Sequence, residues 1–190
     1  MTKFELEKNI LLIELSIKNK ITEIFFKKEV FFKTCLNKKG LNSFNLSREY
    51  LKKTKEKKDN FLEKINIFEH KLQNFYSDSF KENLEKYENW LMNKSKDYEN
   101  YIKNNFHKNL EIKKSKIVIE FKLSKIINRL EKYPIKKQKE SIRLKLGLIS
   151  LEDYIHFYEE YTNLEIEKIT LEKELKILLL EESFRDLEMS

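Results

Sequence analysis

The chain has 190 residues and a mass of 23.3 kDa, which is enough for one domain of ordinary size but not comfortably for two. It contains two glycines, one proline and no alanine. So few turn-forming residues exclude a many-stranded sandwich or barrel, and they exclude a glycine-rich phosphate loop. The composition predicts an elongated all-α protein with roughly four to six helices, some of them about 25 residues or longer.

The net charge of +7 comes from 39 basic and 32 acidic residues, and 35 of the basic residues are lysines. Lysine, asparagine, isoleucine and phenylalanine have A/T-rich codons, so an AT-rich genome accounts for this composition. Lysines also alternate with acids along the chain, for example over 49–59, which is typical of solvated helix faces. Nucleic-acid binding is therefore only the third-ranked interpretation, because base recognition commonly uses arginine forks.

The first segment, 1–76, is expected to form a helical hairpin with its turn at Gly40. Glycine tolerates the positive φ that a tight turn requires, and a long helical pattern follows over about 46–75. Before the turn, isoleucines at steps of three and four mark one face of a helix. These are Ile10, Ile13, Ile17, Ile21 and Ile24.

A connecting helix is expected over 77–111. Ser79 followed by Glu82 has the residues of a capping box, in which two side chains satisfy free N–H groups at a helix start. Apolar residues at helical spacing then resume: Ile112, Ile119, Leu123, Ile126 and Leu130.

The second helical hairpin is expected over 112–190, with its turn at Gly147. Pro134 should break the helix before that turn, because proline lacks the N–H and disfavours helical backbone at the preceding residue. A helix should restart after Ser150, which can cap it, with the acid Asp153 in the first turn.

The clearest apolar stripe follows that restart, with steps that alternate between four and three residues, as in a coiled-coil seam. Its members are Phe157, Tyr161, Leu164, Leu171, Leu175 and Leu178, with one polar interruption at Lys168. Burying such a seam stabilises only where a second helix removes water from it. That helix can come from this chain or from another copy, and the sequence leaves both possibilities open.

The chain also repeats itself. Both glycines stand in a Gly-Leu-x-Ser element, at Gly40 and Gly147, 107 residues apart. Each element follows a helix with an apolar-apolar-Glu-apolar segment, at 12–15 and 118–121, and precedes a long helical pattern. The repetition predicts a duplicated helix–turn–helix.

Residues 143–154 read Arg-Leu-Lys-Leu-Gly-Leu-Ile-Ser-Leu-Glu-Asp-Tyr and continue into a helical pattern that reaches Leu175. A basic residue, then Gly-Leu-x-Ser, then Asp three residues after the Ser and a long returning helix resembles the hairpin tip of the TolC-type outer-membrane efflux factors. The resemblance covers about 143–182, with a weaker echo over 10–75.

The resemblance implies a fold of two such hairpins and a transport-related role. It implies that Leu146, Gly147 and Leu148 form a tip that contacts a membrane-fusion adaptor, with Asp153 capping the return helix. Gly40 and Leu41 would be the weaker equivalent in the first hairpin.

We expect no enzyme, cofactor, metal or small-molecule substrate. The three histidines, His70, His107 and His156, have no second histidine or cysteine at metal-ligand spacing. The glycines are too few for a nucleophile elbow. Cys35 has apolar and aromatic neighbours, which favours a core position over a reactive thiol.

No run approaches 18 apolar residues, so no transmembrane helix is expected, and the N-terminus lacks the pattern of a signal peptide. As written, the chain is expected in the cytoplasm; as part of an efflux factor it would be periplasmic and associated with the outer membrane. The leading interpretation is a non-enzymatic helical-hairpin protein that contacts a protein partner or self-associates through its helical seams. The alternative is a cytoplasmic coiled-coil scaffold or adaptor with no transport role.

Overall fold

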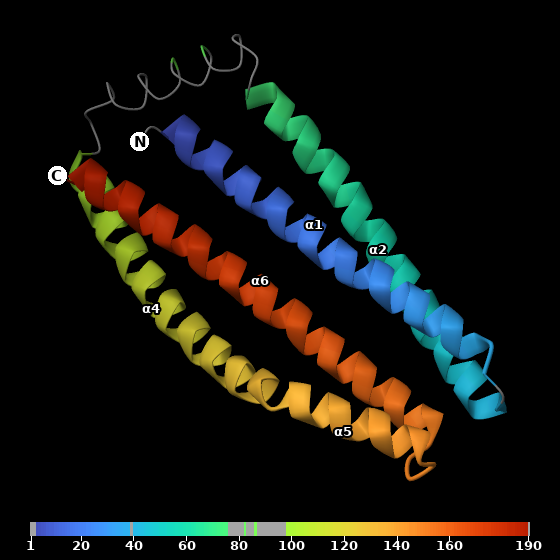
Figure 1. The fold of residues 1–190 in the computed structure, drawn as a ribbon. Coiled ribbons are helices and arrows are strands. Elements are labelled where there is room, and N and C mark those ends of the chain that lie inside the picture. Colours follow the sequence, from blue (N-terminus) through green and yellow to red (C-terminus); the bar gives the residue numbers. More distant parts are fainter. Residues whose placement is uncertain (1–2, 39, 76–81, 83–85, 87–97, 190) are drawn as a thin grey trace.

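A computed structural model of the chain describes residues 3–38, 40–75, 82, 86 and 98–189. No strand occurs within these residues, so the all-α prediction is confirmed. Four helices have 34 to 39 residues, and the molecule is elongated (Figure 1). The helices are α1 (Lys3–Leu36), α2 (Leu41–Phe75), α4 (Tyr98–Glu131), α5 (Tyr133–Lys145) and α6 (Leu151–Met189).

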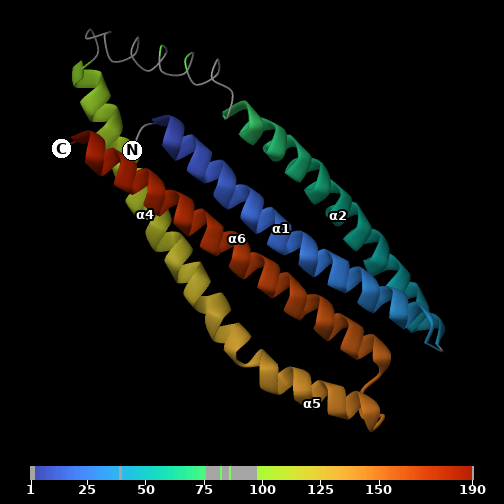
Figure 2. The same cartoon turned by 45° about the horizontal axis from the view of Figure 1, so that its top comes forward.

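The helices form two hairpins that lie side by side in the order α2, α1, α6, α4–α5 (Figures 1 and 2). The first and last helices, α1 and α6, therefore occupy the centre, and each has neighbours on two sides. The turn after α1 and the turn after α5 lie at the same end of the molecule (Figure 1). This arrangement places the two predicted tips close to one another.

The central position of α1 explains its apolar content. Ile17, Ile21 and Phe25 are at most 5% exposed and form one cluster. The cluster receives Phe61 from α2 on one side and Ile169 from α6 on the other. A helix that is covered on two sides needs apolar residues on more than one face.

The break between α4 and α5 lies at the position predicted from Pro134. α4 ends at Glu131, α5 begins at Tyr133, and Pro134 lies in its first turn, where the missing N–H costs no helical hydrogen bond. The expected division at 111/112 falls inside α4, which runs without interruption from Tyr98. The predicted capping box at Ser79 lies outside the described residues.

Ion pairs connect the helices in addition to apolar packing. Glu29 of α1 pairs with Lys58 of α2. On its other side, α1 is joined to α6 by Glu14 and Lys173, whose charged atoms are 3.3 Å apart. An ion pair at 3.1 Å between Arg129 and Glu160 similarly joins α4 to α6.

Candidate functional site: the hairpin tips

The turn at Gly147 is closed by a pair of backbone hydrogen bonds. Gly147 has φ 71°, as predicted for a glycine in the left-handed region. The N–H of Leu148 donates to the carbonyl of Arg143 at 2.8 Å, and the N–H of Gly147 donates to the carbonyl of Leu144 at 3.1 Å. These two bonds are those of a Schellman motif, which satisfies carbonyls that the end of α5 would otherwise leave free.

The start of α6 is fixed by a reciprocal cap. The Ser150 Oγ accepts a hydrogen bond from the Asp153 N–H at 3.1 Å, and an Asp153 carboxylate oxygen accepts one from the Ser150 N–H at 3.2 Å. The helix begins at the next residue, Leu151, as the sequence predicted. With both flanking helix ends satisfied, the backbone of the turn has a defined conformation.

This turn presents two large apolar side chains to solvent. Leu146 is 67% exposed and Leu148 is 65% exposed, on either side of Gly147. The structure therefore brings the three predicted tip residues together, with Asp153 at the base of the same turn. Exposed leucines on a fixed turn form a small apolar surface that another protein can cover.

The turn at Gly40 has a different geometry. Gly40 has φ 129°, and its carbonyl accepts the first hydrogen bond of α2, from the Phe44 N–H at 3.0 Å. The helix therefore begins at Leu41, and the serine of this Gly-Leu-x-Ser element, Ser43, lies inside it and is buried. In the second element the serine precedes the helix, so the two turns are not equivalent and the duplication stays a prediction.

Behind the tips, aromatic residues join the two hairpins. Phe32 of α1 and Ile155 of α6 are fully buried, together with Cys35, which lies in the core as predicted. The Tyr50 hydroxyl of α2 is hydrogen-bonded to Nδ1 of His156 in α6, 2.8 Å away. The two tips thus have a common packed base that limits their relative movement.

The predicted seam of α6 packs within the chain, at least along its first half. Phe157 and Leu164 form a buried cluster with Tyr133 of α5, and Tyr161 contacts the same cluster. Leu171 is also buried, while Leu175 and Leu178 are partly exposed. A second apolar face of α6, which the sequence analysis missed, packs on α1: Ile155, Ile166 and Ile169.

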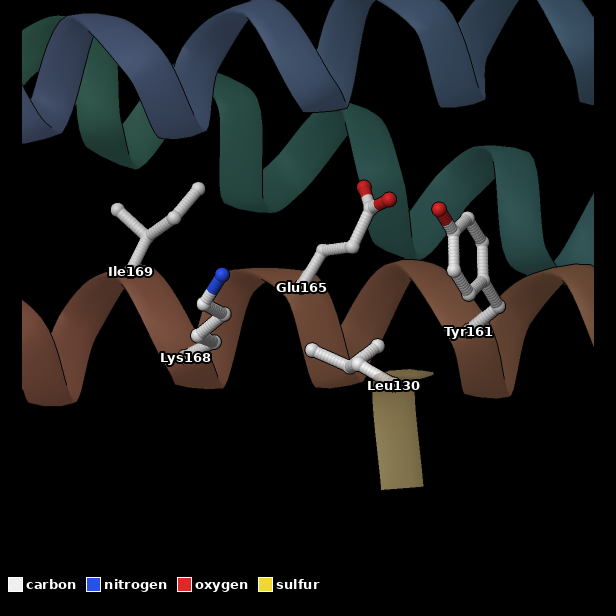
Figure 3. A pocket seen from close by; sticks show the side chains of 5 residues that line it. All are labelled: Leu130, Tyr161, Glu165, Lys168 and Ile169. Atoms are coloured by element: carbon white, nitrogen blue, oxygen red, sulfur yellow. The ribbon is translucent and has the colours of Figure 1, made fainter. Parts of the chain in front are cut away.

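The polar interruption at Lys168 lies beside an open groove of about 300 Å³ between α4 and α6 (Figure 3). Four of its lining side chains project from α6: Tyr161, Glu165, Lys168 and Ile169; the fifth, Leu130, comes from α4 (Figure 3). Lys168 pairs with Glu172 at 3.7 Å. Hydrogen bonding to Glu165, followed by burial, raises the pKa of Tyr161 to about 12, so this phenol is neutral and supplies no base.

No group of three His, Cys, Asp or Glu side chains in the described residues could hold a metal ion. Among the described helices, none combines the length and the apolar run needed to cross a membrane. Comparison with protein-family models, with curated proteins and with solved structures gives no match for this chain.

Proposed function

We propose that this chain is a non-enzymatic helical-hairpin protein that works through protein–protein contacts at its tips, in the manner of the periplasmic part of a TolC-type efflux factor. The observation that supports this most directly is the Gly147 tip, a turn with satisfied helix ends on both sides that exposes Leu146 and Leu148. Binding to a surface that is already ordered loses less conformational entropy than binding to a loose loop.

Two further features fit this role. Both turns lie at one end of an elongated helical body (Figure 2), so one partner can reach both. The packed base formed by Phe32, Ile155 and the Tyr50–His156 hydrogen bond keeps the tips in register behind that surface. Neither feature requires bound substrate or metal.

The test is site-specific photo-cross-linking in cells that make this protein. A photoreactive residue replaces Leu148, and the matched control replaces Leu62, an exposed leucine in the middle of α2. We expect a cross-link from Leu148 to a helical envelope protein, none from Leu62, and loss of the complex in the variant Leu146→Ser/Leu148→Ser.

Fractionation of the same cells distinguishes this proposal from the alternative, a cytoplasmic coiled-coil scaffold. A coiled-coil scaffold with no transport role would stay in the cytosolic fraction, and Leu148 would give no envelope partner. That pair of results would overturn the proposal.

A further inference from the structure

The side of α4 and α5 that faces away from α6 is apolar. Five residues along a helix correspond to about 140° around its axis, so Ile117 and Phe121 lie far around α4 from Ile112 and Ile126, which are buried. The exposed apolar residues of this side are 41–76% exposed. They are Leu110, Ile117, Val118, Phe121, Ile135 and Ile142.

The two helices that carry this side are strongly basic. Residues 108–145 contain thirteen basic and four acidic residues, whereas residues 151–189 contain four basic and twelve acidic residues. Five exposed lysines stand among the exposed apolar positions, and within the described part of the chain none of them forms an ion pair. They are Lys114, Lys125, Lys132, Lys139 and Lys145.

We propose that this α4–α5 outer face, made of these six apolar residues and five lysines, binds the surface of an anionic lipid membrane. The boundary between headgroups and acyl chains accepts apolar side chains, while lysines extend their charged ends to the lipid phosphates. The Nζ of Lys125 lies 4.4 Å from the ring centre of Phe121, so a positive charge and a large apolar side chain stand next to each other on this face. The acidic α6 lies behind this face. The electrostatic field from these separated charges therefore orients the molecule with its basic face towards a negatively charged surface.

Other occupants satisfy only part of this surface. A nucleic acid would neutralise the lysines but leave Ile117 and Ile135 in water. The face changes direction between the end of α4 and the start of α5 (Figure 1), so a straight acidic helix would cover only one of its two parts. Protein surfaces that bind carboxylates commonly use arginine, whose planar guanidinium makes two hydrogen bonds to one carboxylate. This face has lysines instead, which argues against an acidic protein partner. A fluid lipid surface follows the bend and takes up both kinds of side chain.

The experiment is flotation of the full chain with vesicles of phosphatidylcholine alone or with about 30% phosphatidylglycerol, at about 50 mM and about 500 mM sodium chloride. We expect binding to the anionic vesicles that is about tenfold or more tighter than to the neutral ones, and weaker at high salt. The charge variant Lys125→Glu/Lys132→Glu/Lys139→Glu and the apolar variant Ile117→Ser/Phe121→Ser/Ile135→Ser should each bind about tenfold or more weakly.

The matched control is Lys20→Glu/Lys52→Glu/Lys55→Glu, which changes the net charge equally at exposed positions of α1 and α2, and it should bind like the parent. Equal binding by the apolar variant and the parent would overturn the proposal, as would no flotation with anionic vesicles at low salt. Binding to single-stranded DNA or polyglutamate as tight as to the vesicles would also overturn it. The lipid and salt dependence of the parent chain tests the proposal even where a variant does not fold.

Discussion

The Nζ atom of Lys28, in α1, lies 2.9 Å from a carboxylate oxygen of Glu159, in α6, and the Lys28 side chain is only 1% exposed. Lys28 also donates a hydrogen bond to the Asn163 Oδ1 at 3.2 Å. Burial lowers the pKa of Lys28, and the neighbouring Glu159 only partly offsets that effect. The two central helices are thus joined through a buried charge that needs its partner.

Removing one member of this pair should cost more stability than removing both. Glu159→Gln leaves the Lys28 charge buried without a counter-charge, and we expect the free energy of unfolding to fall by about 3 kcal/mol. The double variant Lys28→Met/Glu159→Gln should recover most of that loss. Urea unfolding followed by circular dichroism measures both. The control Glu49→Gln, which breaks an exposed ion pair with Lys53, should leave the free energy of unfolding close to that of the parent.

Stability should fall in acid because carboxylates of α1 are paired. Hydrogen bonds from Lys58 and Lys33 lower the pKa of Glu29 below its usual value of 4.5. A group with a lowered folded pKa stabilises fully above its unfolded pKa, and this contribution is lost as the pH falls through the folded value. The free energy of unfolding should therefore decrease from about pH 5 to about pH 3.

The variant Glu29→Gln tests that assignment. It should be less stable than the parent by about 2 kcal/mol at neutral pH and should show a shallower decrease in acid. Glu56→Gln, at an exposed position of α2, should keep the slope of the parent. An unchanged slope for Glu29→Gln would show that other groups cause the acid sensitivity.

Stability should also fall in alkali because of Tyr158. Burial, and then the charges of Glu165 and Glu159, raise the pKa of Tyr158 to about 12 from the ordinary value of 10.0. Folding thus favours the neutral phenol, so its contribution is complete below pH 10 and is lost as the pH rises towards 12. We expect tyrosinate absorbance to develop later in the folded chain than in urea. Tyr158→Phe should reduce the loss of stability above pH 10; an identical alkaline profile would contradict this account.

A side chain at Gly147 should destabilise the tip through its backbone. A Cβ built at this glycine meets no atom within 4 Å, so the cost comes from φ 71° and not from a clash. Gly147→Val should lower the free energy of unfolding by about 1 kcal/mol or more. Gly147→Asn should cost less, because asparagine tolerates the left-handed region. Thermal unfolding measures the difference, and equal midpoints for all three chains would show that the turn relaxes.

Local signals in the sequence were sufficient for the helix ends around Pro134 and Gly147. Pro134 and Gly147 constrain their own backbone, and the pair Ser150 and Asp153 needs only three residues of separation, so these features could be predicted without knowledge of any neighbour. The apolar stripe through Phe157 and Leu164 was predictable for the same reason, since periodicity is a local property.

The sequence did not predict which helices and side chains contact each other, because those contacts join residues that are far apart in the chain. Among the lysines whose burial the structure describes, Lys28 is the buried one, and nothing in its own sequence neighbourhood separates it from the exposed ones. The second apolar face of α6, with Ile155 and Ile169, could not be recognised from periodicity. A helix that is covered on two sides has apolar residues on two faces, so they do not form one stripe. Likewise, the mixed charge seen over 49–59 does not extend to 108–189, where the basic α4–α5 and the acidic α6 each have one sign in excess.

The position of α1 between α2 and α6 has a consequence for synthesis. α1 leaves the ribosome before α6, so the face of α1 that receives Ile169 stays uncovered until α6 has been made. A contact that spans most of the chain also forms slowly, because a long loop must close first. During this interval, two nascent chains could associate through the uncovered face of α1 that includes Ile17 and Phe25. A chaperone that shields apolar helices would therefore raise the yield of folded protein.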